Sequence, residues 1–157
     1  MNAWMRHDSP LGDLLVVASE RGICGLYFEQ HKYFTGVQGK ENPEYPLLRS
    51  AAVQLDEYFG RARTRFELPL DLRGTPFQLQ VWEGLQQIPF GAVSTYGEQA
   101  RQAGRSRAVR AVGAAIGLNP VCIIVPCHRV LSATGALTGY AGGLERKRHL
   151  LALEQRA

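Results

Sequence analysis

A cysteine and a histidine stand side by side directly after the longest apolar run of the chain. The segment reads Pro126-Cys127-His128-Arg129-Val130. The proline restricts the backbone, so the thiol of Cys127 is presented at a turn rather than along a regular element. A neighbouring imidazole can hold, directly or through a water, the proton that a thiol loses when it becomes a nucleophile, and Arg129 adds positive charge. The pattern indicates nucleophilic chemistry at Cys127.

Other interpretations of this pair stay open at the level of the motif. A free cysteine is usually buried and inert, so Cys127 and His128 could both be ordinary core residues. A zinc site made of Cys122, Cys127, His128 and His149 is poorly spaced, because the chain has no C-x-x-C pair. A cysteine hydrolase of unrelated fold would also use such a pair.

A carboxylate lies on the apolar side of the last predicted helix, residues 144–155. Glu154 follows Leu150 and Leu151 by four and three residues, which places it inside the apolar stripe. A carboxylate that points into a core needs a partner. The alternative is a surface glutamate at a frayed chain end.

A positively charged helix is predicted shortly before the cysteine. Ser106 is expected to cap it, and a core stripe of Val109, Val112, Gly113 and Ile116 follows at helical spacing. The opposite face carries arginines and otherwise only small residues, which lets a helix approach a phosphate backbone closely. These candidate nucleic-acid-binding residues are Arg107, Arg110, Ala111, Ala114 and Gly117. The alternative is an ordinary surface helix.

A second helix precedes this one and completes a helix-turn-helix outline. Thr95 and Glu98 have the spacing of a capping box, and the helix is expected to run to about Ala103, where Gly104 stops it. Upstream, Thr75-Pro76 is a typical helix start, and its helix should end before the Pro89-Phe90-Gly91 segment.

The first part of the chain is predicted as a small α+β unit. Residues 14–19 and 22–28 read as a β-hairpin, residues 29–45 as a loop, residues 48–59 as a helix, and residues 66–70 as an edge strand. We place a domain boundary near residues 71–75. This divides the chain into an N-terminal domain, 1–72, and a C-terminal domain, 75–157.

Composition and charge narrow the class of protein. The 157 residues are 45% hydrophobic, enough for a packed core, but lack a run of about 20 apolar residues that could span a membrane. The first residues lack the apolar core of a secretory signal, and three cysteines cannot make a disulfide framework, so we expect a cytoplasmic protein. Residues 1–74 carry a net charge of −1 and residues 75–157 a net charge of +5, which favours a polyanion partner for the second part.

The order of motifs resembles one family along most of the chain. The cysteine motif, Asn119-Pro120 before it and residues 139–143 after it resemble the signature of the methylated-DNA–protein-cysteine methyltransferases, also called O6-alkylguanine-DNA alkyltransferases. Residues 75–78, 96–98 and 110–113 extend the likeness in the same order. It runs from about Gly74 to Glu154 and weakens upstream.

The resemblance implies a fold and a reaction. The fold is α+β, with a small RNase H-like N-terminal domain followed by a helical, winged-helix-like domain that carries the helix-turn-helix. Cys127 would take the alkyl group of O6-alkylguanine, and of O4-methylthymine, in double-stranded DNA, once and irreversibly. The base would be flipped out from the minor groove. His128 and Glu154 would activate the thiol through a water, and no cofactor or metal is implied.

The resemblance also implies roles for the remaining site residues. Arg110 would enter the vacated base stack, Tyr96 would contact the guanine, and Asn119 would tie the recognition helix to the active-site turn. Val130 would offer a backbone carbonyl to the base, and Tyr140 would line the alkyl pocket. Many relatives have serine where this chain has Ala141, so only the backbone amide of Ala141 is expected to contact the guanine oxygen.

Two classes of protein compete with this function. Alkyltransferase-like proteins share the fold but only bind alkylated DNA, and they lack the cysteine that this chain has at position 127. A cysteine hydrolase would turn over ester or amide substrates without DNA. We expect a monomer that binds neither a membrane nor an obligate protein partner.

Overall fold

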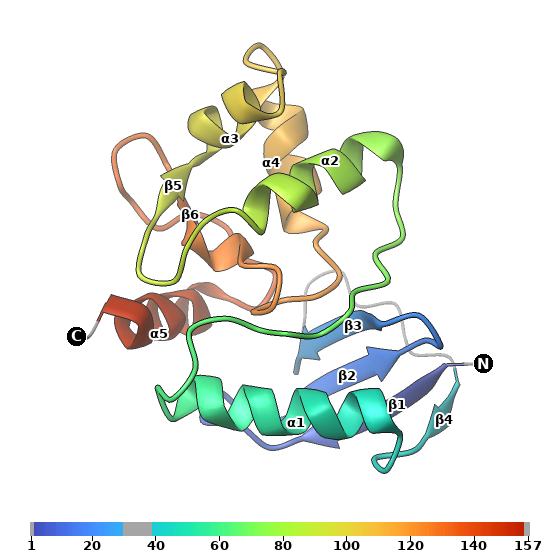
Figure 1. The fold of residues 1–157 in the computed structure, drawn as a ribbon. Coiled ribbons are helices and arrows are strands. Elements are labelled where there is room, and N and C mark those ends of the chain that lie inside the picture. The colour runs from blue at the N-terminus through green and yellow to red at the C-terminus, as the bar shows by residue number, and fades with distance from the viewer. Residues whose placement is uncertain (1, 30–38, 156–157) are drawn as a thin grey trace.

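The computed structural model describes residues 2–29 and 39–155 and has a sheet in its N-terminal part and helices in its C-terminal part (Figure 1). The sheet has the strand order β3-β2-β1-β4, in which β2 pairs antiparallel with both β1 and β3, and β4 pairs parallel with β1. The strands are β1 (Ala3–His7), β2 (Leu14–Ala18), β3 (Ile23–Phe28) and β4 (Lys40–Glu41). The α+β class predicted from the sequence is confirmed.

One helix, α1 (Pro46–Phe59), packs on this sheet and closes the N-terminal core. Leu48, Ala51, Leu55 and Tyr58 are its buried residues, at the helical spacing that predicted the helix. The predicted hairpin is confirmed as β2 and β3. Of the predicted loop 29–45, residues 30–38 lie outside the described part, and β4 occupies two of the rest.

The predicted strand over residues 66–70 is wrong. Leu70 alone forms an isolated bridge, with Ile23 of β3, while residues 66–69 have no strand conformation. Pro69 has no amide hydrogen and therefore cannot donate to a strand ladder. Its carbonyl accepts from the amide of Ile23 at 2.8 Å. The apolar alternation of this segment serves packing, since Phe66, Leu68 and Leu70 lie against the core.

The C-terminal part is a set of short helices around the active-site turn. In chain order its elements are α2 (Pro76–Leu85), β5 (Ser94–Thr95), α3 (Tyr96–Gln102), α4 (Val109–Gly117), the 3-10 turn η1 (Cys127–Arg129), β6 (Val130–Leu131) and α5 (Leu144–Gln155). The strands β5 and β6 pair in parallel and hold the start of α3 beside the turn.

The helix caps show which local predictions are correct. Thr75 and Gln78 form the reciprocal capping box of α2. Thr95 accepts from the Glu98 amide at 3.1 Å, but the Glu98 carboxylate pairs with Arg101, so this second capping box is only half formed. The predicted stop at Gly104 is confirmed by its left-handed φ of 70°.

The connection from α3 to α4 is longer than predicted. Residues 103–108 form it, and α4 begins at Val109 without a side-chain cap, so Ser106 is not the cap. Arg107 consequently lies in the turn rather than on the helix. Val109 was predicted to belong to the core stripe and is 38% exposed, whereas Val112 and Ile116 are buried.

The two parts of the chain share one hydrophobic core. The backbone of Leu26 in β3 bonds to Pro120 and to Cys122, at 2.9 and 3.2 Å, so the sheet supports the segment that leads to Cys127. Arg146 of α5 donates to the carbonyls of Leu11 and Glu29. Among the described residues, no helix is long and apolar enough to cross a bilayer.

Candidate active site

Asn119 fixes the shape of the turn that presents Cys127. Its amide donates to the carbonyl of Val125 at 2.8 Å, and its side-chain oxygen accepts from the amide of Val121 at 3.0 Å. Because Asn119 follows the end of α4, these bonds tie the helix to the turn. Ile123 within the turn has a φ of 71°, a left-handed conformation that strains a β-branched residue.

Cys127 opens into a cavity of about 340 Å³ between the end of α4 and the loop before α5. Tyr96, Asn119, Tyr140 and Ala141, all predicted from the sequence, lie in its wall together with Cys127. The other lining residues are Gly113, Ile116, Gly117, Cys122, Gly139, Gly143 and Leu144. Tyr140 packs edge-on against Phe28 of β3, at a ring distance of 6.0 Å.

Glu154 and His128 meet in the core, as the position of Glu154 in the last helix predicts. The imidazole Nε2 lies 2.6 Å from Glu154 Oε2, and both side chains are almost completely buried. Among the described residues, Nδ1 of His128 is buried without a hydrogen-bond partner. An ionised carboxylate accepts from Nε2–H, which leaves the lone pair of Nδ1 available as a proton acceptor.

Two further side chains donate to the same carboxylate. Arg129 binds both oxygens of Glu154, at 2.8 and 3.0 Å, and Tyr58 of α1 donates to Oε2 at 2.5 Å. Although burial works against the charge, the bonds from His128 and Arg129 lower the pKa of Glu154 to about 2. Glu154 is therefore a buried, fully ionised anion at neutral pH.

The pKa values of the Cys127 thiol and of the His128 imidazole are both lowered, for different reasons. The pKa of Cys127 is lowered, chiefly by a hydrogen bond from Cys122 and further by Asn119 and the charge of Lys147, against the effect of burial. Burial lowers the pKa of His128, with Glu154 acting in the other direction, so His128 is neutral at pH 7. A thiol of lowered pKa that is followed in the chain by a neutral imidazole is typical of a nucleophilic cysteine.

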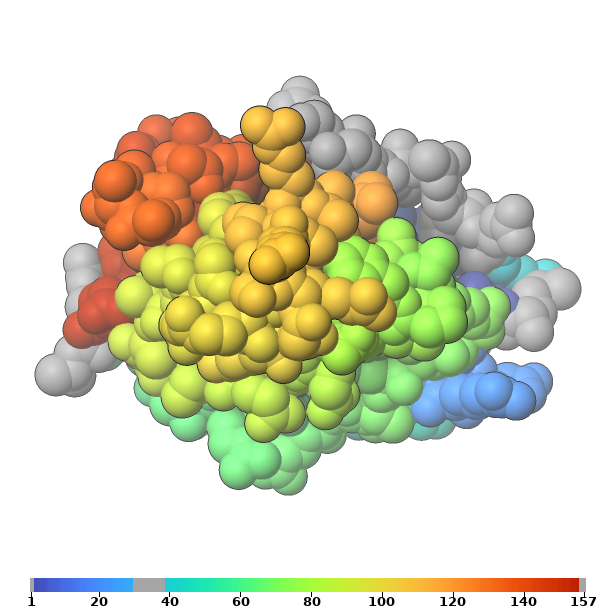
Figure 2. Space-filling model, turned by 90° about the horizontal axis from the view of Figure 1, so that it is seen from above, coloured from blue at the N-terminus to red at the C-terminus, as the bar shows by residue number. Residues whose placement is uncertain are grey.

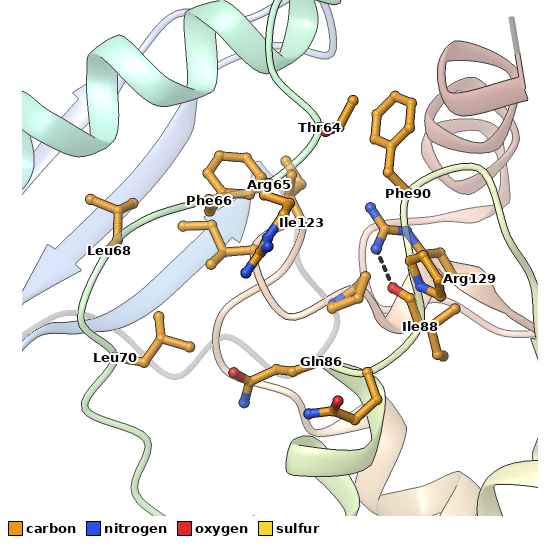
Figure 3. A pocket seen from close by; sticks show the side chains of 14 residues that line it. Thr64, Arg65, Phe66, Leu68, Leu70, Gln86, Ile88, Phe90, Ile123 and Arg129 are labelled. Atoms are coloured by element: carbon orange, nitrogen blue, oxygen red, sulfur yellow. Dashed lines mark hydrogen bonds between the residues drawn. The ribbon is translucent and has the colours of Figure 1, made fainter. Parts of the chain in front are cut away.

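Arg129 stands at the back of the turn, away from the cavity that contains Cys127. Figure 3 shows it in a second hollow, of about 700 Å³, between the segment 64–70 and the end of α2. Its Nη1 donates to the carbonyl of Ile88 at 2.6 Å, and its guanidinium lies 5.9 Å from the ring centre of Phe90 (Figure 3). Arg129 thus anchors Glu154 to the loop after α2.

Lys147 is a buried residue near the site that the sequence reasoning did not single out. Its Nζ donates to the carbonyls of Val130 and Thr138, at 2.7 and 2.8 Å, and the side chain is fully buried. The carbonyl predicted for base contact at Val130 therefore already has one donor. The signal was present in the sequence, because Lys147, Leu150 and Glu154 share one helical stripe of α5.

The predicted DNA-binding residues lie on one exposed face. Arg107, Arg110, Ala111 and Ala114 are exposed and Gly117 is half-buried. Figure 2 looks down on this face, with α3 in yellow, the following turn and α4 in gold at its centre, and the loop before α5 in orange-red at its edge. The face and the opening at Gly117 are continuous, because Gly113 and Gly117 also line the Cys127 cavity.

No described group of three His, Cys, Asp or Glu side chains is placed to hold a metal ion. His149, the fourth member of the zinc alternative, is exposed on α5, while Cys122 and Cys127 are buried. The geometry therefore does not support that alternative.

A mixed α+β fold with a buried Cys–His–Glu set beside a helix-turn-helix defines a class of DNA-directed cysteine alkyltransferases. The family model for the DNA-binding domain of 6-O-methylguanine DNA methyltransferase matches residues 76–156, and the model for its ribonuclease-like domain matches residues 4–72. The chain belongs to this family, and the resemblance drawn from the sequence is confirmed.

Individual relatives are similar over nearly the whole chain. The methylated-DNA–protein-cysteine methyltransferase of Mycolicibacterium paratuberculosis is 47% identical, over 95% of this chain and 90% of its own. The constitutive enzyme of Bacillus subtilis is 43% identical, over 99% and 96%. A solved structure of the Mycobacterium tuberculosis OGT in complex with DNA is 44% identical, covers 98% of this chain and 92% of that one, and superimposes with a TM-score of 0.89.

Proposed function

We propose that this chain repairs alkylated DNA by direct reversal, with Cys127 as the acceptor. The sulfur attacks the alkyl carbon of O6-alkylguanine, a sulfur–carbon bond forms as the carbon–oxygen bond breaks, and guanine leaves with its electron pair. The observation that carries the proposal is a thiol of lowered pKa in a cavity of about 340 Å³, next to a buried His–Glu pair. Methylated-DNA–protein-cysteine methyltransferase is the name of its relatives.

The proton of the thiol goes to His128. Glu154 accepts from Nε2–H of His128, so Nδ1 is the atom that accepts the proton. A bridging water links Nδ1 to the sulfur of Cys127. Cys122 and Asn119 are the hydrogen-bond partners of that sulfur. The carboxylate stabilises the imidazolium that forms. The alkyl group stays on sulfur as a thioether, so each chain reacts once.

The face around α4 binds the damaged duplex. Between residues 99 and 128 the chain has four arginines, all exposed, and no carboxylate, which suits contact with phosphates. Arg107 and Arg110 supply the charge, while Ala111, Ala114 and Gly117 let α4 lie close to the DNA. The target base is flipped from the minor groove into the cavity, and Arg110 fills the vacated stack.

The walls of the cavity hold the flipped base. Tyr96 contacts the guanine ring, Tyr140 lines the alkyl position, and the Ala141 amide faces the guanine oxygen. Val130 does not line this cavity and is fully buried; its carbonyl, which already accepts from Lys147, keeps one lone pair for the base contact that the resemblance implies. O4-methylthymine is the second substrate of the same cavity.

The chain divides its work between residues 1–72, which support the active-site turn, and residues 75–157, which hold the chemistry. It acts as a monomer on double-stranded DNA, without cofactor or metal. Cys24, Cys122 and Cys127 are thiols that form no disulfide, and a reactive Cys127 requires reducing conditions, which suits the cytoplasm.

Mass spectrometry after incubation with a duplex containing O6-methylguanine tests the proposal. We expect one added methyl, on the peptide that contains Cys127, and none with unmethylated duplex. Cys127→Ser should stay unmodified yet still bind methylated duplex, whereas Cys24→Ser, which lies in β3, should react normally. Bound DNA without methyl transfer would favour a protein that only binds alkylated DNA, and turnover of an ester without DNA would favour a hydrolase.

A further inference from the structure

Tyr58 comes from the N-terminal part of the chain and reaches the carboxylate of the proton relay. It lies in the last turn of α1, and Figure 1 shows that end of α1 below α5. Its hydroxyl donates to Oε2 of Glu154, a residue 96 positions further along the chain, at 2.5 Å. The side chain is fully buried, and its ring packs against Phe59, Phe66 and Phe90.

The oxygen that Tyr58 binds is the one that binds His128. Oε2 of Glu154 accepts from the Tyr58 hydroxyl at 2.5 Å, from His128 Nε2 at 2.6 Å and from Arg129 Nη2 at 3.0 Å. Burial, reinforced by the charge of Glu154, raises the pKa of Tyr58 far above its usual range, so the phenol keeps its proton and donates. Each added donor reduces the negative charge that the oxygen offers to the imidazole.

We propose that Tyr58 is a positioning residue of the alkyl-transfer site: its hydroxyl holds Glu154 in place and limits how strongly that carboxylate attracts a proton onto His128. The inference rests on the proposed function and adds to it a residue from outside residues 75–157. Through Tyr58, the N-terminal part of the chain adjusts the proton affinity of His128, in addition to supporting the turn that presents Cys127.

The other charged groups around His128 define the direction of the effect. Burial, Arg129 of η1 and Lys147 of α5 lower the pKa of His128, and Glu154 of α5 raises it. Removing the Tyr58 hydroxyl frees Glu154 to stabilise the imidazolium. The pKa of His128 should then rise, and a larger share of the protein should be protonated, and inactive, on the acid side.

The test is Tyr58→Phe, which keeps the ring and removes only the hydroxyl. A lost hydrogen bond of ordinary strength corresponds to a shift of about half to one pH unit. In the pH profile of single-turnover methyl transfer to methylated duplex, the acid limb should shift to higher pH by that amount. NMR titration of the His128 ring in the free protein should show the same displacement without DNA.

Tyr45→Phe is the matched control. It removes a tyrosine hydroxyl at the other end of α1, where the group donates to the Ser19 carbonyl at 3.4 Å, and it should leave both curves in place. In a Glu154→Gln background, Tyr58→Phe should move neither curve, because the shared carboxylate is gone. Site-specific 3-fluorotyrosine at position 58 keeps the packing and donates more strongly, so it should move both curves downward.

The proposal is overturned if the titration of His128 is the same in the parent and Tyr58→Phe proteins, if Tyr45→Phe moves it equally, or if 3-fluorotyrosine moves it upward. The NMR titration does not depend on catalysis. A protein that transfers no methyl at all would therefore refute the proposed function, while the titration still decides the role of Tyr58.

Discussion

At the scale of single residues, Glu154 is where distant segments of the chain converge. Donors from α1 and η1 surround its carboxylate, and α5 places it in the core. A buried anion with this many donors has little freedom to reorient. It therefore fixes one tautomer of His128, which is the property that a proton relay through Nδ1 requires.

Glu154→Gln should slow methyl transfer at neutral pH by about 10²–10⁴-fold, the range that positioned acid–base groups contribute. An amide can donate to the imidazole as well as accept from it, so the tautomer is no longer fixed. The rate is measured in single-turnover reactions with methylated duplex. Glu145→Gln on the same helix is the control, because Glu145 is exposed and pairs only with Arg148 in the described contacts. Equal rates for the parent and Glu154→Gln would remove Glu154 from the relay.

The residues of the site differ in how far the sequence predicts them. Cys127 and His128 belong to one contiguous motif, and Glu154 shows itself by its place in an apolar stripe. Lys147 carries the same signal on the same stripe but reads as an ordinary charge in a charged helix. Tyr58 carries no signal at all, because a tyrosine in the core stripe of α1 looks like packing, and only the tertiary fold brings it to Glu154.

At the scale of elements, α4 presents its arginine outward and its glycines to the cavity. Arg110 is exposed near the start of the helix, and Gly113 and Gly117, three and seven residues further along the same side of the helix, line the Cys127 cavity. The helix thus spans the distance from the DNA face to the reacting sulfur. We expect the side chain that fills the vacated base stack to come from such an exposed position at the start of α4.

Arg110→Ala should impair repair of duplex DNA by about tenfold or more, yet change the reaction with free O6-benzylguanine little. Extrusion of a base costs a few kcal/mol, and only the duplex requires it. Rates with the two substrates are compared, with Arg148→Ala of α5, which pairs with exposed Glu145, as the control. Equal losses on both substrates would show that Arg110 supports folding rather than extrusion.

Element boundaries show where local reasoning succeeds and where it fails. The helix starts at Thr75 and Thr95 and the stop at Gly104 follow from side-chain and backbone chemistry of a few neighbouring residues, and they are correct. The strand expected over residues 66–70 and the cap expected at Ser106 are wrong. Both depend on partners that are distant in sequence, a neighbouring strand in one case and the packing of α4 in the other, and no local pattern supplies those.

At the scale of the whole molecule, the buried His128–Glu154 pair makes stability depend on pH. In the unfolded chain Glu154 has its ordinary pKa near 4.5, and in the fold it is lowered to about 2. The pKa of His128 is also lowered in the fold. For both groups the unfolded chain binds protons more readily, so acid favours unfolding.

The free energy of unfolding should therefore fall as the pH drops below about 6.5 for His128 and then from about 4.5 to 2 for Glu154, the latter by at most about 3 kcal/mol. Urea unfolding at a series of pH values measures it. In Glu154→Gln the loss between pH 4.5 and pH 2 should be shallower than in the parent. If the free energy of unfolding fell equally with pH in the parent and in Glu154→Gln, the lowered pKa assigned to Glu154 would be wrong.

Alkylation should weaken the whole molecule, because the site that reacts also joins its parts. Cys127 is 7% exposed and lies beside Cys122 and Asn119, and Asn119 ties the end of α4 to the turn. A thioether is only a weak acceptor, so methylation weakens the hydrogen bonds that Cys122 and Asn119 make to the sulfur, and a buried donor left unsatisfied costs about 1–3 kcal/mol. Ile123 already holds the turn in a strained, left-handed backbone conformation, so the turn cannot easily rearrange around the methyl group.

The methylated protein should consequently melt about 2–10 °C below the unreacted form and bind duplex DNA more weakly, since each kcal/mol corresponds to about 2–4 °C for a domain of this size. Titration against excess methylated duplex should first plateau at one methyl per chain, because no described group is placed to cleave a thioether. Thermal curves are then recorded for both forms after removal of the DNA, with Cys127→Ser carried through the same treatment as the control. A plateau above one methyl, or melting curves that overlay, would contradict single use of Cys127 and its coupling through Asn119 to α4.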